Sequence, residues 1–385
     1  MPGDLTMPES DHQPQPQPQP QLQMQMQMHA VAAAAGRSGR GDGPSWLAAR
    51  HHWPAAARVA CGLVLFGMLW LAYLRQVALT PPTDVIEQLT WVRALEWGYY
   101  KHPPLPTWLL WLPVQLFGLA PGVAYALGAV CTLGALWLMW RLMVDLRGRR
   151  FADVALLAAL CISYYNNRLY YYNHNVVMLL ASSAAAFACW RAYSTRRLRW
   201  WLALGASLGL GALAKYQIAL TVLALLGFAT RQRLWHDAAQ RRGLLAAAAL
   251  ASALFAPHLL WLVAHDFAPL GYAMSSSLGV AHSLPQRLTG ALQWSADQLL
   301  NRGLPALLLL GIAAWSARGA PRGGAAAPSP ATAETRAARE LLLWWGWLPL
   351  LATTLLGVAT GAELQLHWGT AFVLFTVPAT MELLW

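Results

Sequence analysis

Long apolar segments separated by short polar or basic stretches recur from residue 59 onward. A helix that crosses a membrane needs about 20 predominantly apolar residues. The pattern predicts about ten spans, at residues 59–78, 121–143, 152–167, 174–192, 200–214, 216–230, 243–263, 298–315, 341–359 and 369–385. The two segments that flank Lys215 are also compatible with one long broken span. We therefore expect an all-α, polytopic membrane helix bundle.

Residues 1–45 do not share this pattern. They contain the low-complexity run QPQPQPQPQLQMQMQM and a stretch rich in Gly, Arg and Ser. Such a composition buries too little apolar surface to fold. We predict a disordered cytoplasmic tail at residues 1–45, without a cleavable signal peptide, and a membrane domain at residues 59–385. Because the chain ends at Trp385, within or just after the last predicted span, this domain is expected to be short at its C-terminus.

Composition supports a membrane protein. The chain has 385 residues, of which 57% are hydrophobic and 11% are charged. Soluble domains carry about 25% charged residues, so a single soluble domain is excluded. The net charge of +11 would suggest nucleic acid for a soluble protein. In so apolar a chain it indicates basic cytoplasmic loops instead, and we expect membrane lipids rather than nucleic acid as partners. The four cysteines lie in apolar runs and have neither metal nor disulfide spacing.

Clusters of arginine predict the orientation of the spans. They are Arg37, Arg40, Arg50 and Arg58; Arg141, Arg147, Arg149 and Arg150; Arg191, Arg196, Arg197 and Arg199; Arg231, Arg233, Arg241 and Arg242; and Arg318, Arg322, Arg336 and Arg339. With a cytoplasmic N-terminus, all of these clusters fall on the cytoplasmic side, as the positive-inside rule requires. The outer face then holds residues 79–120, 164–175, 264–297 and 360–368.

The first outer segment contains an acidic pair, Asp84 and Glu87, three residues apart. We expect a surface helix that starts at Thr83-Asp84, has Trp91, Leu95 and Trp97 on its apolar side, and stops at Gly98. One interpretation makes Asp84 a helix cap of the capping-box type. The other makes it a carboxylate that faces a cavity and either accepts a proton from a hydroxyl or holds a cation. Glu87 alone is typical of a solvated helix face.

Further along this segment, Tyr100, Lys101 and His102 place cationic groups beside aromatic rings. Tyrosine and lysine often anchor a protein at the lipid headgroups. The alternative is a phosphate site in which Lys101 supplies charge and His102 a hydrogen-bond donor. Both interpretations stay open on the residues alone.

The second outer segment, YYNNRLYYYNHN at residues 164–175, combines tyrosines with asparagines. An aromatic belt explains the tyrosines but not Asn173 and Asn175. Aromatic rings with amide groups suit sugars, which present apolar faces and many hydroxyls. We therefore predict substrate contacts for Asn173 and Asn175.

Two more basic residues are predicted on the same face. Lys215 lies in the apolar run GLGALAKYQIALTV and either snorkels to the surface or serves a function. His367 opens the last apolar segment, four residues after Glu363. Two side chains are too few to predict a metal site. Because Asp84, Lys101, Asn175, Lys215 and His367 all fall on one predicted face, we expect a single outward-facing site.

The run DVIEQLTWVRALEWGYYKHPPL at residues 84–105 resembles the first outer loop of bacterial family 39 glycosyltransferases, of the protein mannosyltransferase and aminoarabinose transferase type. Weaker similarities follow in the family's order. They are YNHNVVMLL (172–180), LGLGALAKYQIAL (208–220), DQLLNRGLPALLLLG (297–311) and HWGT (367–370).

The resemblance implies a fold of the GT-C type and a location in the bacterial cytoplasmic (inner) membrane. It implies an enzyme that passes a sugar from a polyprenyl-phosphate carrier to a lipid, glycan or protein acceptor on the outer face, by inversion at the anomeric carbon. Asp84 matches the family's catalytic acid, Lys101 and His102 match the stretch that contacts the carrier phosphate, and Lys215 matches its K-Y motif. No cofactor is firmly implied, although a divalent metal near Asp84 is compatible.

The chain departs from the family pattern at three positions. His102 stands where some members have Lys. Val85 stands where a second acid is expected, and Glu87 is the candidate substitute. Asn175 stands where many relatives carry an acid. Two rival hypotheses are a polytopic lipid or solute transporter, which is expected to have internal repeats and acids near the midplane, and a truncated, non-catalytic membrane protein.

Overall fold

The structure is a computed structural model that describes residues 45–77, 80–278, 282–319 and 332–384, with backbone only for 45–53 and 317–319. Apart from Ser45, the tail predicted to be disordered lies outside the described residues. Residues Arg58–Trp385 form one compact unit. Residues 45–57, the first turns of the first described helix, belong to a separate unit.

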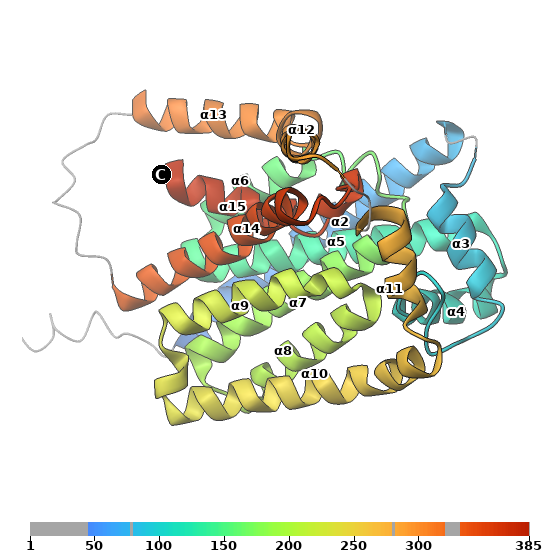
Figure 1. Cartoon of the computed structure of the whole chain (residues 1–385). Helices are drawn as coiled ribbons and strands as arrows, with labels where there is room; N and C mark the ends of the chain where they lie inside the picture. Colours follow the sequence, from blue (N-terminus) through green and yellow to red (C-terminus); the bar gives the residue numbers. More distant parts are fainter. Residues whose placement is uncertain (1–44, 78–79, 279–281, 320–331, 385) are drawn as a thin grey trace, which may run out of the picture. The chain divides into compact units, whose positions relative to one another are not determined.

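Every element within these ranges is helical (Figure 1). The α-helices are α2 (Ser45–Val77), α3 (Thr83–Trp91), α4 (Leu105–Phe117), α5 (Pro121–Arg147), α6 (Arg149–Leu160), α7 (His174–Thr195), α8 (Leu198–Ala214), α9 (Ala219–Arg231), α10 (Ala238–Ala264), α11 (Ala268–Ala273), α12 (Leu284–Ala296), α13 (Leu304–Gly319), α14 (Ala333–Thr360) and α15 (Val373–Leu384). Short 3-10 or π segments are η1 (Tyr216–Ile218), η2 (Leu234–His236), η3 (Met274–Leu278), η4 (Asp297–Arg302) and η5 (Leu366–Gly369).

Among the described residues, five helices are long and apolar enough to cross a membrane: Pro54–Val77, Pro121–Arg147, His174–Thr195, Ala238–Ala264 and Ala333–Thr360. A sixth candidate is the pair Leu284–Arg302 and Leu304–Ser316, which is bent by 65°. The protein is therefore a multi-pass integral membrane protein. Within the described parts of the chain, the predicted count of about ten spans is not reached.

The remaining predicted spans fall on shorter helices. The prediction at 152–167 is wrong, because α6 has 12 residues and ends at Leu160. The segments at 200–214, 216–230 and 369–385 correspond to α8, η1 with α9, and α15. A helix rises about 1.5 Å per residue, so 12 residues reach about 18 Å, short of the bilayer core. Hydropathy alone did not distinguish these short helices from membrane spans, because residues buried against other helices are as apolar as residues facing lipid.

Helix α7 occupies the centre of the helical core. Figure 1 shows α7, α8, α9 and α10 running alongside one another, and α7 packs closely on both α5 and α8. Most of its residues are buried, including Ser182, which hydrogen-bonds Thr221 of α9. The buried small side chains of α7, such as Ala181, Ala185 and Ala186, let the neighbouring helices approach. Both ends of α7 are therefore fixed relative to α5 and α8.

The two ends of these helices differ chemically. Basic side chains at one end form ion pairs that join separate helices: Arg147–Glu382, Arg191–Asp145, Arg196–Asp237 and Arg231–Glu340. These arginines belong to the clusters that the sequence assigns to the cytoplasm. The start of α7, the end of α8 and the start of α9 lie at the other end, where the predicted site residues are found.

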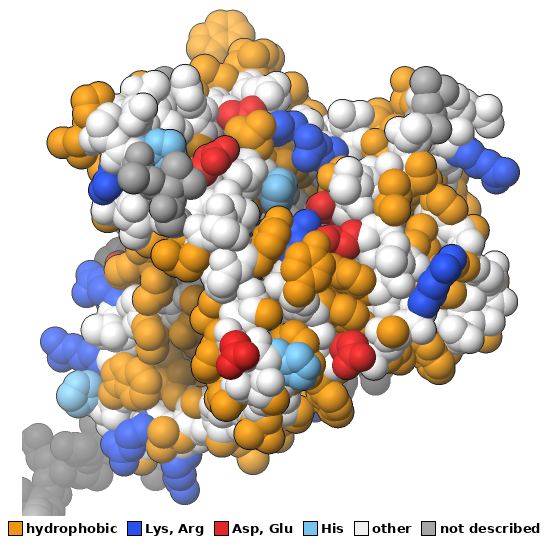
Figure 2. Space-filling view, turned by 45° about the vertical axis from the view of Figure 1, so that its right-hand side comes forward, with side chains coloured by type: hydrophobic (Ala, Val, Ile, Leu, Met, Phe, Trp, Pro, Cys, Tyr) orange, Lys and Arg blue, Asp and Glu red, His pale blue; other side chains and the backbone are white. Residues whose placement is uncertain are grey.

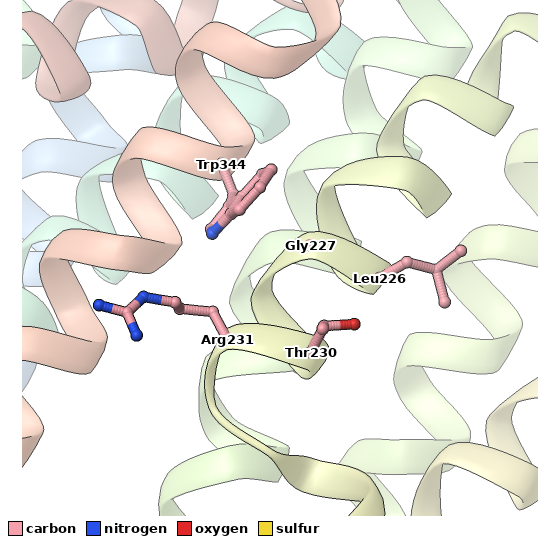
Figure 3. A pocket seen from close by; sticks show the side chains of 5 residues that line it. All are labelled: Leu226, Gly227, Thr230, Arg231 and Trp344. Carbon is pink, nitrogen blue, oxygen red and sulfur yellow. The ribbon is translucent and has the colours of Figure 1, made fainter.

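Close packing between α9 and α14 depends on Gly227. A hollow of about 320 Å³ lies there, lined by Trp344, Arg231, Thr230 and Leu226 (Figure 3). A Cβ atom added at Gly227 would lie 2.4 Å from Cε3 of Trp344.

We expect Gly227→Ala to lower the free energy of unfolding by about 1–3 kcal/mol, because the Trp344 ring has to move. The measurement is the apparent melting temperature of the purified protein. Gly62→Ala is the matched control, since a Cβ there meets nothing within 4 Å. Equal melting temperatures for the two variants would contradict this packing.

Candidate active site

The site is built around the first turn of α7. Asn173 is its N-cap: the side-chain oxygen accepts hydrogen bonds from the backbone N–H groups of Asn175 (3.0 Å) and Val176 (3.2 Å). Such a cap satisfies N–H groups that have no partner within the helix. The side-chain amide of Asn173 then donates to Oδ2 of Asp84 at 2.9 Å. Asn173 is buried, so one amide both starts α7 and holds the carboxylate of Asp84.

Asp84 lies in the first turn of α3, but it is not a helix cap. The N-cap position of α3 is Pro82, and no side-chain cap hydrogen bond forms there. The interpretation of Asp84 as the cap of a capping box is therefore wrong. Its carboxylate is only half-buried and its described partner is an amide.

The surface helix ends earlier than predicted. α3 stops at Trp91 rather than at Gly98, and Leu95 and Trp97 lie beyond it with exposed side chains. The Trp91 ring stacks on Tyr99, with ring centroids 4.6 Å apart. This contact folds the chain back along α3 and brings Lys101 beside Glu87.

Lys101 and Glu87 form an ion pair with an N–O distance of 3.1 Å. Burial lowers the pKa of Lys101, but the hydrogen bond and the charge of Glu87 outweigh it and raise that pKa overall. The ammonium also lies 5.4 Å from the ring centroid of Tyr272. Lys101 therefore stays charged, and Glu87 is its partner rather than a second free acid.

A buried polar layer next to the Lys101–Glu87 ion pair was not predicted from the sequence. Thr107 donates to Gln88 at 2.9 Å, and the Gln88 amide lies 3.3 Å from Nε2 of His174. The rings of His174 and His102 are 3.8 Å apart between centroids. Gln88 follows Asp84 by one helical turn, and His174 lies between the two predicted asparagines, so both were visible as polar residues in apolar surroundings.

The buried position of His102 disfavours protonation of its ring. Burial, together with the charges of Lys215 and Lys101, holds the pKa of His102 well below its usual value. The unfolded chain takes up this proton near pH 6.5, whereas the folded chain does not, so stability falls as the pH drops below about 6.5.

We expect the apparent melting temperature to be lower at pH 5 than at pH 7.5. The difference is expected to shrink in His102→Gln, which cannot protonate. His236→Gln, on the other end of the helices, serves as the control. An unchanged pH dependence in His102→Gln would contradict a neutral His102.

Lys215 interrupts the chain between α8 and α9. α8 ends at Ala214, Lys215 is extended, and η1 begins at Tyr216. Its ammonium donates to Oδ1 of Asn175 at 2.6 Å and lies 5.9 Å from the ring centroid of Trp368. The side chain is therefore directed to the start of α7, which disfavours snorkelling to the surface.

His367 and Tyr100 occupy less central positions. His367 lies in η5, next to Trp368, and its pKa is lowered by burial and by the charge of Lys215. Tyr100 is 58% exposed, with its ring against the edges of Trp91 and Tyr272. Tyr100 therefore lies on the rim of the candidate active site.

The predicted residues therefore meet at one place, with a particular distribution of charge. In the described contacts, Asp84 and Lys215 are held by neutral amides, whereas Lys101 and Glu87 compensate each other. Figure 2, in which the right-hand side of Figure 1 comes forward, shows acidic, basic and histidine side chains gathered near the middle of this face. No group of three or more His, Cys, Asp or Glu side chains among the described residues is placed to hold a metal ion.

One known protein family is similar to part of this chain. Residues 101–261 match the family described as dolichyl-phosphate-mannose-protein mannosyltransferase. This part of the chain is similar to that mannosyltransferase family. The matched range contains Lys101, Asn173, Asn175 and Lys215, while Asp84 precedes it. No curated protein matches the sequence.

Two solved structures have a fold similar to that of this chain. Crystal structures of ArnT from Cupriavidus metallidurans, bound to undecaprenyl phosphate and in the apo state, match with TM-scores of 0.54 and 0.52 at 16% sequence identity. Each match covers 84% of this chain and 59% of the ArnT chain. At this identity the likeness establishes an ArnT-like fold, and the present chain spans well under two thirds of ArnT.

Proposed function

We propose that the protein is a membrane glycosyltransferase that moves a sugar from a polyprenyl-phosphate donor to a hydroxyl or amine of an acceptor. The observation that carries the proposal is the pairing of Asp84 and Lys215 with neutral amides at the start of α7. An amide fixes the position of a charged group without cancelling its charge. The site thus presents a positioned carboxylate and a positioned ammonium within one polar network.

In this proposal Lys215 faces the donor phosphate. Its ammonium lies beside Trp368 and Asn175, and its charge stabilises the phosphate as the bond to the sugar breaks. Lys101, held by Glu87, adds a second cation to the same surface. The undecaprenyl phosphate bound to ArnT, which has the same fold, supports a polyprenyl-phosphate donor.

Asp84 acts as the general base. The acceptor oxygen or nitrogen attacks the anomeric carbon, and its proton passes to the carboxylate of Asp84. The bond between the anomeric carbon and the phosphate oxygen breaks, and the polyprenyl phosphate leaves with the electron pair. A single displacement of this kind inverts the anomeric carbon. Asn173 is a positioning residue, since its amide and carbonyl oxygen are engaged with Asp84 and the backbone of α7.

The proposal places the site on the outer face of the bacterial inner membrane. Among the described residues, Arg147, Arg191, Arg196 and Arg231 of the basic clusters lie at the opposite ends of the same helices, which supports this orientation. The direct test is donor turnover by the purified full chain in lipid nanodiscs. The expected result is release of undecaprenyl phosphate from undecaprenyl-phosphate sugars, mannose and aminoarabinose among them, as the sugar passes to an acceptor hydroxyl or amine or to water. Absence of release from every such donor, with the protein folded, would contradict the proposal.

A further inference from the structure

A buried histidine that makes no direct contact with Asp84 or Lys215 connects two segments of the candidate active site. His258 lies near the end of α10, and its side chain is fully buried. Its Nδ1 atom lies 2.6 Å from the carbonyl oxygen of Trp97, and its Nε2 atom lies 2.8 Å from the hydroxyl oxygen of Tyr216. The ring therefore joins α10 to the first outer segment and to η1.

The two partners of His258 determine which ring nitrogen carries the hydrogen. A carbonyl oxygen can only accept a hydrogen bond, so Nδ1 donates to Trp97. In the neutral ring Nε2 then has no hydrogen, and it accepts a hydrogen bond from the Tyr216 hydroxyl. Both ring nitrogens are engaged with the protein. His258 is therefore suited to hold two chain segments in place rather than to transfer a proton to or from a substrate.

The chain approaches α10 closely at the Trp97 bond. Gly98, the next residue, is buried, and a Cβ atom there would overlap the ring of Trp261. Trp261 follows His258 on the same face of α10, and the two rings are stacked with 5.8 Å between their centroids. The first outer segment is therefore fitted to α10 at this point by backbone as well as side-chain contacts.

This contact with α10 lies just before the turn that carries Lys101. Tyr99 stacks on Trp91, and its backbone N–H donates to the carbonyl oxygen of His102 at 3.0 Å. The hydrogen bond closes a short turn, with Lys101 inside it. The position of the Lys101 ammonium therefore depends on where the preceding residues meet α10.

The Tyr216 bond acts directly beside Lys215. α8 ends at Ala214, Lys215 has an extended backbone, and η1 has three residues. The Tyr216 ring also stacks on the His258 ring, with 5.9 Å between centroids and 24° between planes. The hydroxyl bond and the ring contact together hold η1 against α10, and so they hold the break in the chain from which Lys215 projects.

We propose that His258 is a positioning residue for both lysines of the candidate active site. Its Nδ1–H holds the segment that leads to Lys101, and its Nε2 holds η1 beside Lys215. The ring thereby sets the spacing of the two ammonium groups that face the donor phosphate. Misplacement of such a group by about 1 Å can reduce a rate by about 10²-fold. The inference rests on the proposed glycosyltransferase function, in which His258 acts through the lysines.

Conservative substitutions separate the two bonds of His258. Tyr216→Phe keeps the ring and removes only the hydroxyl, so the bond to Nε2 is lost. His258→Gln places an amide near the position of Nε2 and keeps a partner for Tyr216, whereas the Trp97 carbonyl loses its donor. Tyr193→Phe is the matched control, because its hydroxyl lies 3.4 Å from Gln232 at the other end of the helices.

Backbone hydrogen exchange tests the two connections without any enzyme activity. The full chain is measured by mass spectrometry in lipid nanodiscs that contain no donor. The backbone N–H of Tyr99 donates to His102, and that of Ile218 donates to Lys215. Exchange at these two positions therefore reports how firmly each segment is held.

Each substitution is expected to loosen one segment. Tyr216→Phe is expected to speed exchange about fivefold at Ile218 and to leave Tyr99 unchanged, whereas His258→Gln is expected to do the reverse. The control variant is expected to change neither position. Unchanged exchange at both positions in both variants would overturn the inference, whatever the activity of the protein.

Donor turnover then tests whether the effect passes through the lysines. Tyr216→Phe is expected to lower kcat about tenfold, and to have little further effect in the Lys215→Met background. His258→Gln is expected to depend on Lys101→Met in the same way. A loss of stability alone would lower turnover by the same factor in both backgrounds, and that result would contradict a positioning role.

Absence of donor turnover in the unaltered protein would be a different result. It would contradict the glycosyltransferase function, whereas the exchange measurement would still decide whether His258 holds the two segments.

Discussion

Asp84→Asn is expected to reduce sugar transfer by about 10²–10⁴-fold, the range that general-base catalysis contributes. Asparagine keeps an oxygen that accepts from the amide of Asn173, so the start of α3 and the cap of α7 remain in place. The substitution removes the basicity and the charge of the carboxylate. Donor binding is expected to change little, since the phosphate is held by lysines. The measurement is kcat and KM for an undecaprenyl-phosphate sugar that the unaltered protein consumes.

Glu96→Gln is the matched control for this variant. Glu96 lies in the same outer segment with an exposed side chain, and it is expected to retain full activity. Glu87→Gln distinguishes the role of Glu87 from that of Asp84. Because Glu87 pairs with Lys101, its loss is expected to change KM more than kcat. Full transfer by Asp84→Asn would remove this carboxylate from the mechanism.

Lys215→Met is expected to reduce kcat by about 10²–10³-fold, comparable to the loss of one group that stabilises developing charge. Methionine retains much of the aliphatic chain beside Trp368 but cannot donate to Asn175. The phosphate would then leave without its nearest ammonium. Weaker retention of undecaprenyl phosphate is expected in the same variant.

Arg231→Met controls for loss of a basic residue on the same pair of helices. Arg231 ends α9, whereas Lys215 precedes it, and Arg231 pairs with Glu340. The control is expected to keep full turnover. Equal activity of the two methionine variants would show that Lys215 serves packing alone.

The long helices were predictable because hydropathy reports length and apolar character directly. Five predicted spans coincide with helices that are long enough to cross a membrane. α6 could not be recognised as a short helix from the sequence. Its alanines are buried against other helices, and their hydropathy is the same as that of a membrane span. The end of α3 at Trp91 was also missed: it depends on the stacking of Trp91 on Tyr99, a contact that no local pattern encodes.

The site residues were selected by residue type, and the structure brings most of them together, but their contacts were not predictable. Asn173 was expected to bind substrate, and in the structure it caps α7 and holds Asp84. Gln88 and His174 were passed over because an isolated buried polar residue gives no indication of its partner. Pairing between α3 and α7 requires knowledge of how distant helices pack, which one sequence does not contain.

The central claim is that the polyprenyl phosphate binds at the start of α7 and not elsewhere on the helices. It is tested by photocrosslinking, with a photoreactive amino acid at Tyr100 on the rim of the site, or at Thr230 in the hollow at the far end of α9. Radiolabelled undecaprenyl phosphate is expected to attach to the protein through position 100 and not through position 230. Attachment through position 230 alone, or equally through both, would contradict the account.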